Sequence, residues 1–232
     1  IVDSLVEGAR RSKGLIVVID VLRAFTTASV VFQRGADHII MVADVEEALT
    51  LREQKRVDLC IGEVDGFKPE GFDFGNSPFE LSQIDLSGLV IAQSTRAGTT
   101  GITMAASNEY TRLFAGALVN AAATAKVVAE SHAELVTLVA MGAWGTTRSD
   151  EDEQCALYMK NRIQGRHPDR EAVRNLVLSG EESQKYHDPV QIQYHPEDLE
   201  LASRPDSVDF AIELKRQDEF LVARPVYAEV DC

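Results

Sequence analysis

The sequence predicts an α/β protein with a mainly parallel sheet and helices on both sides. Apolar runs of strand length alternate with helical patterns as far as Met141. Most of these runs are continuously apolar, as expected for strands that are covered on both faces. Alternation of this kind is typical of a parallel sheet built from successive strand and helix units.

The elements of this first part follow from the apolar pattern. The predicted strands are Leu15–Asp20, His38–Val42, Asp58–Gly62, Leu89–Gln93, Leu113–Val119 and Glu134–Met141. The helical patterns between them cover Ala24–Arg34, Asp44–Gln54, Thr99–Ser107 and Ala121–Ser131. Asp44 and Glu47 have the spacing of a capping box, which supports the start of the second helix.

The pattern changes after Met141. Asp150–Gly165 reads as a helix with an acidic first turn, favourable at the positive end of the helix dipole, and Asp169–Ser179 reads as another. Residues 181–205 are polar and broken by three prolines, and the last apolar run predicts an antiparallel hairpin around Gln217, Asp218 and Glu219. We predict a single domain over residues 1–232, with 150–232 as a C-terminal helical and hairpin elaboration.

Composition limits the classes of function. The chain has 232 residues, 45% of them hydrophobic, which is enough for a substantial core. Its net charge of -14 argues against a nucleic acid or an anionic membrane surface as partner. No apolar run approaches the roughly 18–20 residues of a membrane span. Three widely spaced cysteines, Cys60, Cys155 and Cys232, suggest free structural thiols and a cytoplasmic protein.

Polar clusters directly follow five of the predicted strands. They are Asp20 with Arg23; Glu63, Asp65 and Lys68; Ser94 to Arg96 with Gly98 to Thr100; Asn120; and Gly142 through Asp152. In an open, mostly parallel sheet the carboxyl ends of the strands line a common edge, where ligands bind. The coincidence of five clusters therefore predicts a ligand site at that edge.

Each cluster also has a plainer structural interpretation. Asp20 either caps the helix that begins near Ala24 or binds metal or substrate. Glu151 and Asp152 form either a solvated first helical turn or a metal-binding pair. Asn120 is most simply a helix N-cap, a role compatible with facing a ligand.

The loop from Ser94 to Gly101 is a predicted anion-binding loop. Its glycines permit close backbone approach, Arg96 offers a bidentate guanidinium, and a helix N-terminus follows. An ordinary strand-to-helix turn is the alternative interpretation.

The common covalent phosphoryl-transfer motifs find no support in the chain. The P-loop pattern GxxxxGK[ST] is absent. Asp20 has Leu22, not a second Asp, two residues on. No Cys-x5-Arg loop follows either Cys60 or Cys155. Carboxylates beside arginines and hydroxyls suit instead Mg²⁺-assisted chemistry on a phosphorylated anion.

Six stretches, in order along nearly the whole chain, match a known family. They are VVIDVLRAFTTA (Val17–Ala28), GADHIIMVADVEEAL (Gly35–Leu49), GEVDGFKPEGFDFGNSPFE (Gly62–Glu80), STRAGTTG (Ser94–Gly101), GALVNAAATA (Gly116–Ala125) and SDEDEQCA (Ser149–Ala156). The combination of DVLRA, GFDFGNSP and the Ser-Thr-Arg loop is specific. The chain thereby resembles the Mg²⁺-dependent 2-phosphosulfolactate phosphatases of coenzyme M biosynthesis.

The resemblance implies a three-layer α/β/α sandwich with a mainly parallel, mixed central sheet. It implies a hydrolase of phosphoric monoesters that converts (2R)-2-phospho-3-sulfolactate and water to (2R)-3-sulfolactate and phosphate, with Mg²⁺ as cofactor. The implied catalytic residues are Asp20, Glu63 and Arg96, and the implied metal ligands are Asp20 and Glu63 with Glu151 or Asp152. The implied substrate-binding residues are Arg23, Ser94, Thr95, Gly98, Thr99, Asn120, Lys68 and Asn76.

Some questions stay open at this point. The general base is unassigned, with Asp20 and Glu151 as candidates and His132, His187 and His195 as weaker ones. Many family members have Glu-Arg at the start of the long loop, whereas here Val64 follows Glu63. A phosphatase for a related phospho-carboxylate, such as phospholactate or phosphoglycerate, and a non-catalytic protein that binds an anionic metabolite are therefore the alternatives. The expected partners are a small anionic phosphorylated substrate and a second copy in a homodimer.

Overall fold

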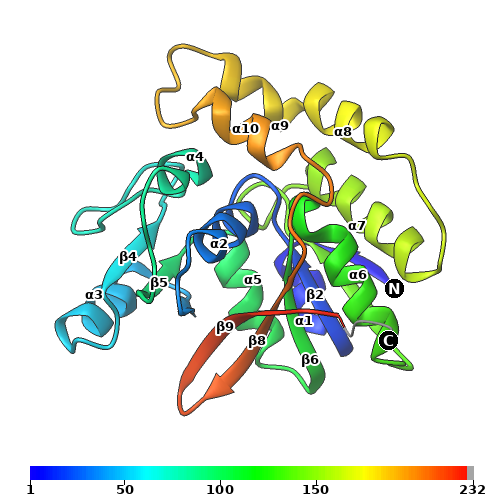
Figure 1. Cartoon of the computed structure of the whole chain (residues 1–232), viewed down its shortest axis with the longest axis horizontal. Coiled ribbons are helices and arrows are strands. Elements are labelled where there is room, and N and C mark those ends of the chain that lie inside the picture. Colours follow the sequence, from blue (N-terminus) through cyan, green and yellow to red (C-terminus); the bar gives the residue numbers. More distant parts are fainter. Residues whose placement is uncertain (229–232) are drawn as a thin grey trace.

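Apolar segments build one central sheet in the computed structural model, which describes residues 1–228 (Figure 1). Its strands in the described residues are β1 (Val2–Ser4), β2 (Gly14–Ile19), β3 (His38–Val42), β4 (Leu59–Gly62), β5 (Val90–Ser94), β6 (Tyr110–Gly116), β7 (Val136–Ala140), β8 (Ala211–Gln217) and β9 (Phe220–Val226). The six apolar runs and the closing hairpin are confirmed as strands, except that the run predicted to end at Val119 leaves the sheet after Gly116 and forms a 3-10 turn at Leu118–Asn120. The short β1 was not predicted, because three residues carry no readable period.

The sheet has the order β1-β7-β2-β6-β8-β9-β3-β5-β4. The strands β1, β7, β2 and β6 form one parallel block, and β3, β5 and β4 form another. The hairpin β8–β9 joins the blocks by antiparallel pairing, with Leu214 opposite Leu113 and Ala223 opposite Ile39. The predicted fold class, α/β with a mainly parallel, mixed sheet, is therefore confirmed.

Helices cover both faces of this sheet. The helices are α1 (Leu5–Arg11), α2 (Ala24–Gln33), α3 (Val45–Glu53), α4 (Pro78–Ser82), α5 (Gly98–Ala105), α6 (Ala121–Glu130), α7 (Asp150–Ile163), α8 (Arg170–Ser179), α9 (Glu181–Gln184) and α10 (Pro196–Ala202), with 3-10 turns η1 (Leu118–Asn120) and η2 (Lys185–His187). Asp44 caps α3 as expected, since its Oδ1 accepts the Glu47 N–H at 2.8 Å.

The alternation of side chains along β2 shows the layers. Ile16 and Val18 belong to the core beneath α2 and α5, whereas Leu15, Val17 and Ile19 belong to the core beneath α6 and α7. All five side chains are fully buried. A strand that is apolar on both faces is thus explained by helices on both faces.

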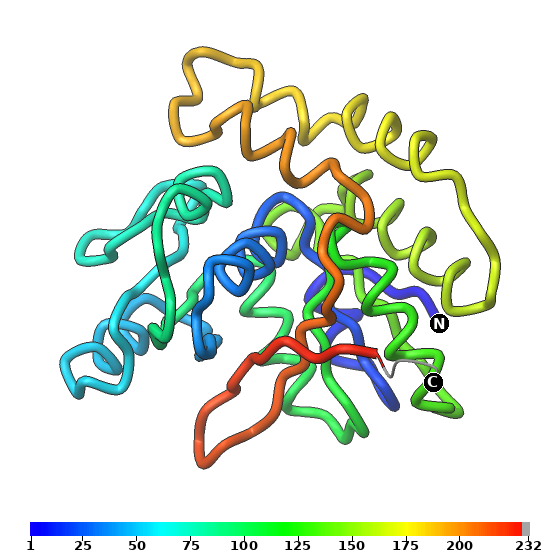
Figure 2. The backbone as a smooth tube through the Cα atoms, in the orientation of Figure 1, coloured from blue at the N-terminus to red at the C-terminus, as the bar shows by residue number. Residues whose placement is uncertain are grey.

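The segment after α7 forms a cap over the site loops. From α7 the chain passes through α8 and returns as α9, η2 and α10 (Figure 2). We call residues 181–202 the cap; its last helix, α10, packs against α4 of the long loop 63–80. The cap therefore contacts a loop more than a hundred residues earlier in the sequence.

Two further expectations concern the whole chain. Cys60 and Cys155 are buried and unpaired, whereas Cys232 lies outside the described residues. In the part of the chain that the structure describes, each helix is too short or too polar to cross a bilayer.

Candidate active site

The ends of β2, β4, β5 and β7 meet the cap at one cavity. Its polar or aromatic side chains come from all five segments: Asp20 and Arg23, Glu63 and Asn76, Arg96, Trp144 with Glu151 and Asp152, and Glu182, Lys185 and Tyr194. The strand-end clusters thus supply most of the cavity, and the cap closes it.

Asp20 lies at the end of β2 and combines both roles considered for it. Its Oδ1 accepts the Ala24 N–H at 3.0 Å, which caps the start of α2. The same carboxyl group lines the cavity and is only 7% exposed. Burial raises the pKa of Asp20 to about 6; the Ala24 N–H opposes this rise and the negative charge of Glu63 adds to it.

Glu151 and Asp152 are buried, so the solvated first turn does not describe them. Their residues are 4% and 2% exposed. The Asp152 carboxylate accepts the Val21 N–H at Oδ1 and the Gly142 N–H at Oδ2, both at 2.8 Å. It thereby ties the ends of β2 and β7 together. Burial, with the charges of neighbouring carboxylates, raises the pKa of Asp152 well above its usual value.

Glu151 gives a prediction for stability against pH. Burial raises its pKa from 4.5 to about 7. Below pH 4.5 the carboxyl group is protonated in both states and costs nothing; as pH rises to 7 the unfolded state loses its proton first, so the folded state loses stability. Without divalent ions, we expect the free energy of unfolding of Glu151→Gln, relative to that of the wild type, to rise by about 2–3 kcal/mol from pH 4.5 to pH 8.

Urea unfolding at the two pH values measures this gain. The matched control is Glu46→Gln, because Glu46 is an exposed glutamate in the first turn of α3. An equal difference between Glu151→Gln and the wild type at both pH values would show that burial does not hold a proton on Glu151.

Glu63 holds two loops in place through backbone hydrogen bonds. Its Oε2 accepts the Gly66 N–H and its Oε1 accepts the Arg96 N–H, each at 2.8 Å. The preceding Gly62 has φ +148°, and a Cβ there would lie 1.8 Å from the Ser94 carbonyl oxygen. Only glycine permits this approach, which is what brings Glu63 beside the end of β5.

Arg96 is the one charged residue of the predicted anion loop Ser94–Gly101. Its side chain is 49% exposed and forms an ion pair with Asp65. Ser94 and Thr95 line a neighbouring cavity that shares Glu63 and Arg96 as walls. Of the predicted loop residues, Ser94 and Thr95 thus line the neighbouring cavity, whereas Gly98 and Thr99 line neither of the two.

The threonine hydroxyls of this loop build the loop itself. The Thr95 N–H donates to Thr99 Oγ1 at 2.8 Å, and the Thr99 N–H donates to Thr95 Oγ1 at 3.1 Å. A Cβ at Gly98 would lie 2.8 Å from Asp20 Oδ2, so glycine lets α5 begin against the Asp20 carboxyl group. These contacts explain the small residues at this strand end.

Several predicted site residues lie outside the cavity. Asn120 is fully buried, with Oδ1 accepting the Ala117 N–H at 2.9 Å and Nδ2 donating to the Ala115 oxygen at 3.2 Å. It stands at the N-cap position of α6, but its side chain makes no cap hydrogen bond. Lys68 lines a third cavity together with His195, which hydrogen-bonds to Glu80. The cavity contains none of the three histidines proposed as weaker bases.

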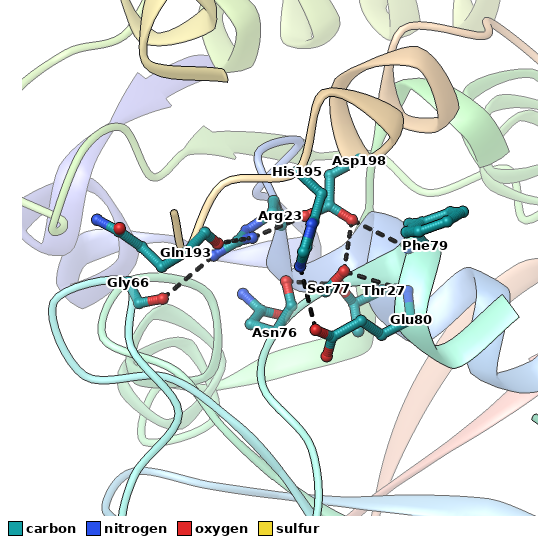
Figure 3. Close-up of polar contacts among 10 residues, drawn as sticks. All are labelled: Arg23, Thr27, Gly66, Asn76, Ser77, Phe79, Glu80, Gln193, His195 and Asp198. Atoms are coloured by element: carbon teal, nitrogen blue, oxygen red, sulfur yellow. Dashed lines mark hydrogen bonds and ion pairs between the residues drawn. The ribbon is translucent and has the colours of Figure 1, made fainter. Parts of the chain in front are cut away.

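Arg23 is the centre of a buried network that joins three segments (Figure 3). Its Nη1 donates to Asp198 Oδ2 at 2.7 Å and to the Gln193 carbonyl oxygen at 2.9 Å. Asp198 Oδ1 accepts the Ser77 hydroxyl at 2.7 Å and the Phe79 N–H at 3.0 Å. The network fastens the cap and the long loop to the end of β2.

Sequence reasoning missed the cap side chains Glu182, Lys185 and Tyr194. They lie in a polar, proline-broken stretch with no strand end nearby. Two tyrosines, Tyr186 and Tyr194, in that polar stretch were the available signal. Both are held in the fold, because Tyr186 is 1% exposed and its ring lies 5.3 Å from that of Tyr194.

The donor atoms of the cavity suit a hard cation such as Mg²⁺. They are carboxylate oxygens and the Asn76 amide, and Asn76 Oδ1 is buried without a hydrogen-bond partner in the described residues. A cation would also offset the burial that raises the pKa of Asp20 and Glu151. Within residues 1–228, however, no three acidic, histidine or cysteine side chains already form a metal cluster.

Buried carboxylates and cations at the strand ends of an α/β sheet suit the binding of a phosphorylated anion. Residues 2–220 match the model of the 2-phosphosulpholactate phosphatase family. The chain therefore belongs to the 2-phosphosulfolactate phosphatase family, and by class it is a hydrolase of phosphoric monoesters with a small phosphorylated substrate.

Curated relatives with this family name occur in archaea and bacteria. A protein named probable 2-phosphosulfolactate phosphatase from Bacillus subtilis is 30% identical over 207 residues, 88% of either chain. One of the same name from Caldicellulosiruptor saccharolyticus is 31% identical over 216 residues, 86% of this chain and 88% of the relative. Another from Thermoplasma volcanium is 29% identical over 193 residues, 83% of this chain and 85% of the relative.

Proposed function

We propose that the protein hydrolyses (2R)-2-phospho-3-sulfolactate to (2R)-3-sulfolactate and phosphate. The observation that carries the proposal is the cavity in which Asp20, Glu63, Glu151 and Asp152 face Arg96, in a chain of this family. The finer parts of the proposal are Mg²⁺ dependence, a role in coenzyme M biosynthesis, a cytoplasmic location and a homodimer.

Mg²⁺ would be held by Asp20 and Glu63 with Glu151 or Asp152, and Asn76 Oδ1 is the neutral oxygen beside them. Bound there, it would supply positive charge to the phosphoryl oxygens. The protein positions these ligands through backbone N–H groups, at 2.8 Å for both oxygens of Glu63 and of Asp152. Each oxygen keeps a further lone pair for a cation.

Arg96 would bind the phosphoryl group, exchanging its partner Asp65 for a phosphoryl oxygen. Phosphoryl transfer depends mainly on positioning and on charge stabilisation, which a guanidinium fork supplies. Glu151 would act as the general base with Asp152 completing the metal site, since a carboxylate that holds the cation cannot also accept the proton of the water. In this step a water oxygen bonds to phosphorus, the ester P–O bond breaks, and the leaving alkoxide takes up a proton.

Arg96→Ala tests the anion-binding role. We expect a loss of kcat/KM of about 100-fold or more, because one charge-stabilising donor is worth about 10²–10³ in rate. Stability should change by less than about 0.5 kcal/mol, since the side chain is half exposed. Arg10→Ala is the control, because Arg10 is an exposed, ion-paired arginine away from the cavity. Unchanged turnover in Arg96→Ala would remove Arg96 from the site.

Phosphate release from racemic 2-phospho-3-sulfolactate, with and without Mg²⁺, tests the function itself. Phospholactate and 3-phosphoglycerate serve as comparison substrates. We expect Mg²⁺-dependent hydrolysis of half the racemate, with the other two esters poor. Faster hydrolysis of a comparison ester would identify a related phospho-carboxylate as substrate, and release from none would favour a non-catalytic binding protein.

A further inference from the structure

The cavity presents three cations to a substrate, and they differ in how firmly they are held. Arg23 is 4% exposed, and its charge is matched by Asp198 at 2.7 Å. Arg96 is half exposed and pairs with Asp65. Lys185, from the cap, is 22% exposed and pairs with Glu182, which lines the same cavity. Arg23 is thus fixed in the framework, whereas Arg96 and Lys185 can exchange partners.

Lys185 is the lysine that the cap contributes to the cavity. Its Nζ lies 4.6 Å from the centre of the Tyr194 ring, another wall of the cavity. Its charge reaches Asp20, where it acts to lower the pKa against the dominant effect of burial. An ammonium group has three donors, and the pair with Glu182 occupies one of them.

We propose that Lys185 binds the anionic group of the substrate that is not the phosphate, a carboxylate or a sulfonate. This inference rests on the proposed function, in which the substrate carries such groups beside its phosphate ester. Arg96 and Lys185 come from different segments of the cavity wall, one from the end of β5 and one from the cap. The phosphoryl end of the substrate would contact Arg96 and the Mg²⁺ ion proposed at the carboxylates, and the other end would contact Lys185. The cap therefore determines substrate specificity.

A panel of esters of one shape tests this role. 2-Phospho-3-sulfolactate carries both extra anionic groups, 2-phospholactate carries the carboxylate alone, and glycerol 2-phosphate carries neither. For Lys185→Gln we expect kcat/KM to fall about 10- to 100-fold on 2-phospho-3-sulfolactate, mainly through KM, and less than about 3-fold on glycerol 2-phosphate. Lys185→Arg should restore most of the loss. The effect of Lys185→Gln on 2-phospholactate identifies the group: a large loss assigns the carboxylate to Lys185, and a small one assigns the sulfonate.

The control variant is Lys215→Gln, because Lys215 is an exposed lysine that pairs with a glutamate and lies away from the cavity. An equal loss on all three esters would reduce Lys185 to a structural residue of the cap, and no loss on any would exclude it from the site. Either outcome overturns the inference.

Binding of 3-sulfolactate, measured by calorimetry, separates this inference from the proposed function. Binding that is weakened by Lys185→Gln, in a protein that hydrolyses none of the esters, would support the inference and refute the proposed function. Hydrolysis by the wild type, with neither activity nor binding depending on Lys185, would support the proposed function and refute the inference. A wild type that neither binds nor hydrolyses would overturn both.

Discussion

Replacing Asp198 with alanine is expected to lower the free energy of unfolding by about 3–5 kcal/mol, because it leaves a buried guanidinium without its counter-charge. The side chains of Arg23 and Asp198 are 3% and 0% exposed and lie 2.7 Å apart. The variant also leaves the Ser77 hydroxyl and the Phe79 N–H without the acceptor that Asp198 provides. Urea or thermal unfolding of the whole chain measures the loss.

Glu200→Ala is the matched control for this loss. Glu200 lies two residues further along the same helix and pairs with Arg174 and Arg204, but its side chain is 51% exposed. We expect a change below about 1 kcal/mol there. If Asp198→Ala unfolds too readily to measure, the double variant Arg23→Met with Asp198→Leu should recover much of the stability, because it removes both charges. An Asp198→Ala protein as stable as the Glu200→Ala protein would refute the buried network as the fastening of the cap.

Replacing Asp20 with asparagine is expected to reduce kcat/KM by about 10³-fold and to raise the Mg²⁺ concentration that gives half-maximal activity. The amide keeps an oxygen for the Ala24 N–H, so the hydrogen bond at the start of α2 is preserved. It removes the negative charge that a divalent cation would meet. Initial rates over a series of Mg²⁺ concentrations measure both effects.

Asp85→Asn controls for the loss of one negative charge, since Asp85 is exposed and lies before β5, away from the cavity. A Mg²⁺ dependence that is the same for Asp20→Asn as for the wild type would remove Asp20 from the proposed ligands. Loss of the fold, visible in circular dichroism, would assign the loss of activity to the broken hydrogen bond at the start of α2.

The local pattern of the sequence was enough to predict most elements but not their long-range order. The strand β2 is apolar at every position, so both its type and its burial could be read directly. The hairpin β8–β9 was predicted too, with its turn at Asp218. Its place between β6 and β3 depends on pairings such as Leu214 with Leu113, which no local period encodes.

The same division applies to the cavity. Asp20, Glu63, Arg96 and Glu151 share it because each follows a strand, and strand ends are recognisable in sequence. Their catalytic roles stay predictions. The partner of Arg23 is Asp198, 175 residues away in a short helix, so the network that fixes Arg23 could not be read from the chain. Lys185 was missed for the same reason.

The central hairpin has a consequence for how the protein is made. During synthesis β8 and β9 emerge after all the other strands of the sheet, yet they lie between its two parallel blocks. Until residues 211–226 have left the ribosome, the edges of β6 and β3 have no partner, and unpaired edges invite pairing with other chains. The sheet of this enzyme therefore closes only once the hairpin has emerged, and a nascent chain that stalls before residue 211 exposes both edges to other chains.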